Sequence, residues 1–227
     1  MGSTVTQTAA SELALVNISD FVRDELAEQT TFLKLSKKAV LPNTHKFEDF
    51  LVIVKSGWVA LNFNGKAVCL LRPGEVFLES AWPLQAEASH RNISVSAATS
   101  SELVLVERAA FFAAVASRPN ILFSLYAHSC KRMLQMVTDV ARQNAENLET
   151  RLAYFLWDLG MPAAEGSRKL PVLSQSVISE ILGARREEIS RKRKALVEQG
   201  LLEERADGEY VSADVGVSAF AAGYGRA

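Results

Sequence analysis

The stretch SQSVISEILGARREEISRKRKALVEQG, residues 174–200, predicts two short helices joined by a glycine. Ser174 can cap a first helix over residues 175–182, because its hydroxyl can accept a hydrogen bond from an unpaired N–H group of the first turn. Gly183 allows the turn that follows, and a second helix begins at residue 185 or 186 and ends near residue 199. Two short helices joined in this way form a helix-turn-helix.

Apolar residues recur every three or four positions in this stretch, which is typical of helices with one buried face. In the second helix we expect Ile189, Leu196 and Val197 to face the core. Downstream, Asp207-Gly208 separates two short runs and favours a tight hairpin turn. The segment therefore predicts a helix-turn-helix followed by a β-hairpin wing.

The second helix is strongly basic. Residues 184–194 hold six basic and two acidic side chains, a formal charge of +4, in a chain of net charge −1. Such runs are often only solvated surface. Here they lie on the helix that enters the major groove in helix-turn-helix proteins, where arginine can bind guanine and glutamate can accept from cytosine. We therefore expect contacts with double-stranded DNA from Arg186, Glu187, Arg191, Arg185, Ser190, Ser174, Gln175, Arg193 and Lys194.

The region from Phe32 to about Val106 predicts a small all-β domain, because its short apolar runs are broken by turn residues. Asn64-Gly65 tolerates positive φ angles and suits a two-residue hairpin turn. A helical stretch follows the last strand. The expected strands are residues 50–54, 58–63, 67–71 and 102–106.

Residues 120–148 contain no Gly or Pro and predict one long helix, followed by a helix over 151–159 and a loop over 160–167. The long helix carries a stripe at alternating spacings of four and three, the pattern of a two-stranded coiled coil. The same stripe could instead pack on the chain's own β-domain. The predicted dimer interface is Leu122, Tyr126, Ser129, Met133, Met136 and Val140.

In this order the elements resemble the catabolite activator protein and fumarate-nitrate regulator (CRP/FNR) superfamily. Residues 182–191, LGARREEISR, are similar to the recognition-helix signature of that family, and residues 54–59 and 72–77 are similar to the glycine turns of its cyclic-nucleotide-binding roll. The resemblance implies that Arg186 and Arg191 contact guanines of a TGTGA-type half-site, and that Glu187 contacts the cytosine opposite a guanine.

The resemblance also implies an α+β fold in three parts. We expect an N-terminal cyclic-nucleotide-binding-like β-roll over residues 1–118, a long dimerisation helix over 119–148, and a C-terminal winged helix-turn-helix over 149–227. A homodimer would place two recognition helices about 34 Å apart on a palindrome, with Arg193 and Lys194 on phosphates. RNA polymerase is an expected further partner, and activation and repression remain alternatives.

The effector site departs from the family pattern. Nucleotide-binding members hold the cyclic phosphate with a Gly-Glu-Leu-type cassette and an Arg-Ser or Arg-Thr pair, of which only Glu79 and Arg91 match here. Met136 and Val137 stand where the cAMP-binding member has a polar Thr-Ser pair, and apolar side chains cannot hydrogen-bond a base edge. The sequence thus predicts no definite cofactor and disfavours a cyclic nucleotide. Effector-independent, haem-responsive and redox-responsive regulation remain alternatives.

An enzyme on a cupin-like β-roll is the alternative from another class. Such a site needs clustered ligands, whereas His45, His90 and His128 are each isolated, so we expect no catalytic or metal site. Cys69 and Cys130 show no paired spacing, which indicates a reducing compartment, and we expect both to be buried residues that fill space in the core. No apolar run reaches the roughly 18 residues of a membrane span, so the sequence predicts a cytoplasmic protein without a membrane partner.

Overall fold

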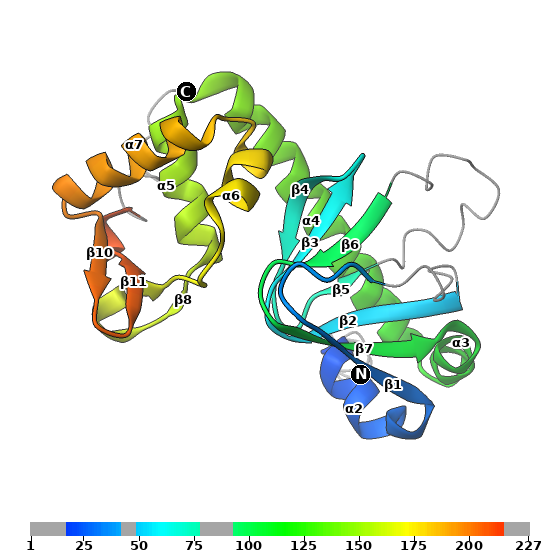
Figure 1. Ribbon diagram of the computed structural model, residues 1–227. Helices are drawn as coiled ribbons and strands as arrows, with labels where there is room; N and C mark the ends of the chain where they lie inside the picture. The colour runs from blue at the N-terminus through cyan, green and yellow to red at the C-terminus, as the bar shows by residue number, and fades with distance from the viewer. Residues whose placement is uncertain (1–16, 42–48, 78–92, 216–227) are drawn as a thin grey trace, which may run out of the picture. The chain divides into compact units, whose positions relative to one another are not determined.

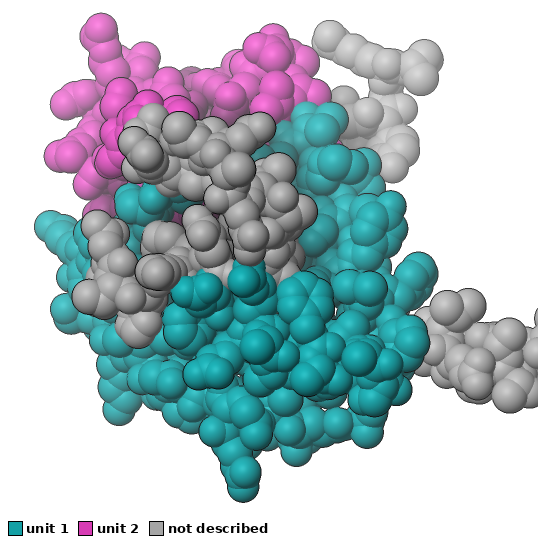
Figure 2. All heavy atoms as spheres, turned by 90° about the vertical axis from the view of Figure 1, so that its right-hand side faces the viewer, with its two compact units in different colours: residues 1–59, 71–137 teal, residues 60–70, 138–227 magenta. Residues whose placement is uncertain are grey.

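The computed structural model describes residues 17–41, 49–77 and 93–215. By its internal contacts the chain divides into two compact units, which Figure 2 shows in different colours. The first unit comprises residues 1–59 and 71–137, and the second comprises residues 60–70 and 138–227.

The β-strands of the predicted roll form two sheets (Figure 1). One sheet has the strand order β1-β7-β2-β5 and is antiparallel throughout, and the other has the order β4-β3-β6. All four expected strands are present. The strands are β1 Thr30–Leu35, β2 Phe50–Ser56, β3 Val59–Phe63, β4 Lys66–Leu71, β5 Val76–Phe77, β6 Ile93–Ala97 and β7 Ser101–Glu107.

Two glycine turns connect strands of the roll. Asn64 and Gly65 have φ angles of 51° and 75°, so the predicted hairpin turn between β3 and β4 is confirmed. Gly57, between β2 and β3, has a φ of 79°, and a Cβ atom there would lie 2.3 Å from the carbonyl oxygen of Ser100. Any larger residue at position 57 would therefore clash with the backbone.

Helices pack on the four-stranded sheet and close the core of the first unit. They are α2 Ile18–Glu25, with the short 3-10 helix η1 Ala27–Gln29 after it, α3 Arg108–Ser117 and the first turns of α4 Pro119–Ala145. The core contains Phe21 from α2, Phe111 from α3 and Ile121 from α4. Sequence patterning had not predicted α2, which the side chain of Asn17 caps.

The long helix α4 is shorter than predicted, because the predicted end at Leu148 belongs to the next helix. α4 ends at Ala145, and α5 spans Leu148–Leu159. The side chain of Asn147 accepts a hydrogen bond from the backbone N–H of Thr150 at 3.0 Å and so starts a new helix. The apolar periodicity predicted a single helix up to residue 148, but this cap begins α5 at that residue.

The second unit contains α5, α6 and α7 and a small sheet of strand order β10-β11-β9-β8. The hairpin of β10 and β11 confirms the predicted wing. The expected loop over 160–167 is only partly correct, because Met161–Pro162 pairs with the next strand around a 3-10 turn. The bounds are α6 Gln175–Leu182, α7 Arg186–Glu198, β8 Met161–Pro162, η5 Ala164–Gly166, β9 Arg168–Lys169, β10 Leu202–Arg205 and β11 Gly208–Val211.

The core of this unit lies between the three helices and the sheet. Ile189 and Leu196 of α7 are buried as predicted, but Val197 is 42% exposed. Neighbouring helical residues point about 100° apart, so Val197 lies at the edge of the buried face while Leu196 is 2% exposed at its centre.

Candidate nucleic-acid interface

Local hydrogen bonds set the geometry of the helix-turn-helix. The Ser174 hydroxyl accepts from the N–H of Val177 at 3.4 Å and caps α6. Gly183 ends that helix with a φ of 62°, in the left-handed region that favours glycine. The Glu188 carboxylate then accepts from the backbone N–H of Arg185 at 3.1 Å and caps α7. Both helices thus start and end where the sequence predicted, within one residue.

The two sides of α7 differ in chemistry. Ile189 and Leu196 face the core, and Lys192 and Arg193 on the same side are half-buried. The opposite side is exposed and carries five of the residues expected at DNA, which are Arg186, Glu187, Ser190, Arg191 and Lys194. The structure therefore brings the predicted base-contacting residues together on one exposed face of α7, defined here as the reading face.

The remaining predicted DNA-contacting residues lie near the starts of the two helices. Gln175 is exposed in the first turn of α6, and Arg185 is exposed at the residue before α7. Ser174 is half-buried and serves as the α6 cap. Helix N-termini carry a partial positive charge, which favours phosphate contacts at these positions.

Two side chains anchor α7 to α5. Lys192 Nζ lies 2.9 Å from Glu149 Oε2, and the Gln199 side-chain amide donates to Glu149 Oε1, also at 2.9 Å. The hydrogen bond from Lys192, with that from Gln199, lowers the pKa of Glu149 below its ordinary value. Sequence reasoning missed this anchor, because Glu149 lies 43 residues before Lys192.

Arg193 also has a partner within the chain. Its guanidinium forms an ion pair with the Glu209 carboxylate of β11, and the two side chains are only 16% and 33% exposed. Arg193 is thus the one predicted phosphate-contacting residue of α7 whose side chain pairs with a carboxylate of the wing. Of the six basic residues in 184–194, two are thus neutralised by carboxylates from outside the segment.

The turn of the wing is held by a polar cluster. Asp207 accepts from Lys169 Nζ at 2.7 Å and from the Tyr210 hydroxyl at 2.6 Å. These hydrogen bonds, with that from Lys169 contributing most, lower the pKa of Asp207 to about 2. The Arg205 guanidinium stacks on the Tyr210 ring at 4.3 Å from its centre.

The predicted dimer stripe is on the surface of the chain. In α4, buried side chains are confined to the first turns, at Ile121, Ser124 and Leu125. Packing of the stripe on the chain's own core, the alternative interpretation, is not what the structure shows. Its members are Leu122, Tyr126, Met133, Met136 and Val140, which are 50–66% exposed, and Ser129, which is half-buried.

Some of the candidate effector residues belong to the described part of the chain and others do not. Glu79, Arg91, His45 and His90 lie outside the described residues, and Met136 and Val137 are 60% and 61% exposed on α4.

Two residues of α4 contact the roll. His128 Nε2 lies 3.1 Å from the carbonyl oxygen of Val76, and Arg132 donates to the same oxygen at 3.2 Å. These contacts connect α4 to β5.

Within residues 17–41, 49–77 and 93–215, no group of three or more His, Cys, Asp or Glu side chains could hold a metal ion. No described helix is both long and apolar enough to cross a membrane. Cys69 and Cys130 form no disulfide and are half-buried, so the prediction that both are buried fillers was wrong in degree.

Residues 150–215 match the family model of the Crp-like helix-turn-helix domain. The chain carries a Crp-like helix-turn-helix. The match covers α5 to the wing, which are the elements that hold and flank the reading face. No curated protein sequence matches the chain.

Solved structures match nearly the whole chain in fold. A CooA variant from Carboxydothermus hydrogenoformans is 18% identical with a TM-score of 0.66, over 91% of this chain and 96% of that chain. FixK2 from Bradyrhizobium japonicum is 21% identical with a TM-score of 0.66, over 82% and 94%. The c-di-GMP responsive regulator CLP from Xanthomonas campestris is 20% identical with a TM-score of 0.61, over 86% and 97%. Together with the Crp-like helix-turn-helix, this shared fold confirms the predicted CRP/FNR resemblance.

Proposed function

We propose that this CRP/FNR-type transcription regulator binds a palindromic TGTGA-like site as a homodimer. The observation that carries the proposal is the reading face of α7, which is exposed and basic while the opposite side of the helix is packed. A helix held on one side and exposed on the other can enter a major groove without rearrangement.

Each residue of the reading face has a chemical role in this proposal. Arg186 and Arg191 each present a guanidinium that can donate two hydrogen bonds to guanine, and Glu187 can accept from the cytosine amino group. The sugar-phosphate backbone is contacted by residues at the edge of the face and at the helix starts. These are Arg185, Ser190, Ser174, Gln175 and Lys194.

The dimer part of the proposal rests on α4. An exposed stripe at coiled-coil spacing costs free energy in water unless another surface covers it. A second copy of α4 offers the same stripe in the same register, so two chains can bury it symmetrically. A parallel pair would bring two reading faces to the same side of the DNA, about one helical turn apart.

The β-roll supplies the regulatory part of the proposal. His128 and Arg132 of α4 both contact the carbonyl oxygen of Val76, so a displacement of β5 would also displace α4. Met136 and Val137 lie on the same helix, within two turns of Arg132. An effector bound to the roll would thus change the relative position of the DNA-binding halves, and RNA polymerase would be the partner at the promoter.

The test is binding of fluorescent duplexes by the full chain at fixed salt. A duplex with two TGTGA half-sites one turn apart should bind at least a hundredfold more tightly than a scrambled duplex. A duplex with half a turn inserted between the half-sites should lose most of that preference, because the second reading face then points away from its groove. Equal affinity for all three duplexes contradicts the proposal. Repeating the titration with cyclic AMP, with haem and after oxidation tests the effector alternatives.

A further inference from the structure

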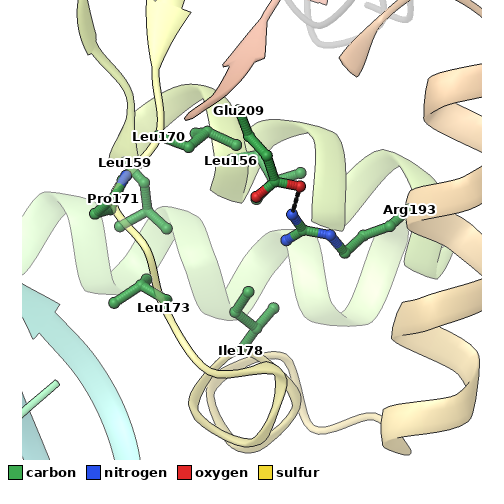
Figure 3. A pocket seen from close by; sticks show the side chains of 8 residues that line it. All are labelled: Leu156, Leu159, Leu170, Pro171, Leu173, Ile178, Arg193 and Glu209. Atoms are coloured by element: carbon green, nitrogen blue, oxygen red, sulfur yellow. Dashed lines mark hydrogen bonds and ion pairs between the residues drawn. The ribbon is translucent and has the colours of Figure 1, made fainter. Parts of the chain in front are cut away.

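We propose that Arg193 is a positioning residue that fixes the wing against α7 and does not bind phosphate. This inference rests on the DNA binding proposed above and refines it. The Arg193 side chain points to the wing side of α7, toward Glu209 of β11 (Figure 3). Its neighbour Lys194 is on the exposed side.

The surroundings of the ion pair are apolar. Figure 3 shows Arg193 and Glu209 pointing toward each other beside a hollow lined by side chains of α5, α6 and the segment between β9 and α6. A charged group in such surroundings is stable only while its partner is in place, because removing one partner leaves an uncompensated charge. The apolar residues of the lining are Leu156, Leu159, Leu170, Pro171, Leu173 and Ile178.

The place of Glu209 in β11 allows its one ion pair with Arg193 to restrain the wing. Glu209 is the second residue of β11, it lies opposite Glu204 of β10, and its carbonyl oxygen accepts from the N–H of Leu170 at 2.9 Å. The ion pair with Arg193 therefore connects α7 to the strand that joins the wing hairpin to the rest of the small sheet. The wing and the reading face are then held at one fixed angle.

Movement of Arg193 to a phosphate would break this connection. The guanidinium would have to leave a site where it is 16% exposed, and the Glu209 carboxylate, which is 33% exposed, would lose this ion pair beside the apolar side chains. Lys194 has no such constraint, because its side chain is 80% exposed and its ion pair with Glu198, at 3.9 Å, is on the surface of the same helix. Lys194 is accordingly the matched control for a phosphate contact.

The first measurement is the salt dependence of binding to the palindromic duplex. Arg193→Ala should weaken binding about tenfold but leave the slope of log K against log salt unchanged, because Arg193 neutralises no phosphate. Lys194→Ala should reduce the slope by about 0.9 for each phosphate that is no longer neutralised, and a dimer on its site has two such phosphates. The double variant Arg193→Met/Glu209→Met removes both charges and keeps apolar bulk, so it should bind within about threefold of the parent protein.

The second measurement needs no DNA. Amide hydrogen exchange of residues 208–211 should be faster in Arg193→Ala, unchanged in Lys194→Ala, and slow again in the double variant. Failure of the parent protein to prefer the palindrome would overturn the proposed function, while this exchange measurement would still decide the role of Arg193.

Three results would overturn the inference. The first is a slope for Arg193→Ala that falls as far as that for Lys194→Ala. The second is wing exchange that does not respond to Arg193→Ala. The third is a double variant that binds as weakly as the single one. Should Arg193→Ala fail to fold, Arg193→Met with Glu209 intact provides the single variant for both measurements.

Discussion

Helices α4 and α7 both present an exposed face, and the two faces differ in chemistry. The face of α4 is apolar, with Tyr126, Met133, Met136 and Val140 each more than half exposed. The reading face of α7 is basic and remains well solvated in the single chain. Burying an apolar surface against another apolar surface lowers the free energy, because it removes both from water. Binding of exposed cations to nucleic acid also lowers the free energy, because it releases counterions from the nucleic acid. This difference supports the two partners proposed above, a second copy of the chain for α4 and DNA for α7.

The largest expected effect comes from placing a charge in the apolar stripe of α4, which tests whether this stripe is the dimer interface. Met133→Glu would place two carboxylates close to each other across the two-fold axis of the dimer, in apolar surroundings. We expect the dissociation constant of the dimer to rise about a hundredfold or more, as measured by sedimentation. The control Lys131→Glu changes charge on an exposed residue outside the stripe and should leave the dimer intact. A dimer unaffected by Met133→Glu would mean that α4 is not the interface.

On α7, removal of a single base-reading side chain should have the next largest effect. Arg186→Ala should weaken binding to the palindromic duplex by about 1–3 kcal/mol, because guanine then has no bidentate donor. Glu187→Ala should relax the preference at one base pair. Affinities for a panel of single-base variants of the site would measure both. Losses of the same size on scrambled DNA would show that the reading face contributes charge and no base recognition.

A smaller effect is expected from the packed side of α7, where Glu149 of α5 binds Lys192 and Gln199 and so orients the helix. Glu149→Ala removes the partner of Lys192 and Gln199, and we expect the unfolding midpoint to fall by about 2 °C, since partly exposed ion pairs contribute little. Glu198→Ala removes only the surface partner of Lys194 and is the control, with no expected change. Thermal unfolding followed by circular dichroism measures both variants. Identical midpoints for the two would mean that Glu149 does not hold α7.

The smallest predicted effect concerns pH and the wing beside α7. The pKa of Asp207 is lowered to about 2 by Lys169 and Tyr210, so its contribution to stability is complete above the ordinary value of 3.8. That contribution should disappear as the pH falls from about 4 to about 2, when the carboxylate is protonated in the folded state. NMR titration of the Asp207 carboxyl would measure this, with Asp207→Asn as the variant that lacks the transition. A midpoint near 4 would contradict the hydrogen-bonded cluster.

Sequence reasoning predicted elements that depend on near neighbours. The α6 cap at Ser174, the left-handed turn at Gly183 and the hairpin at Asn64-Gly65 each require only a few adjacent residues, and all are present. The break between α4 and α5 also had a local signal, an asparagine at 147 before Thr150, which the continuous apolar pattern obscured. By contrast, β8 and β9 are two residues long and exist only through pairing within the small sheet, which no local pattern indicates.

The sequence by itself determined that a basic second helix of a helix-turn-helix carries Arg186, Glu187 and Arg191, and that a periodic stripe follows the β-roll. Tertiary structure alone decided which charges remain available to DNA, because Glu149 and Glu209 lie far along the chain from Lys192 and Arg193. The physical reason is that a side chain's charge is available to a ligand only when no carboxylate brought near by folding has already paired with it. Helical periodicity puts Arg193 and Lys194 on different sides of α7, and the fold supplies an acidic partner from another element to only one of them.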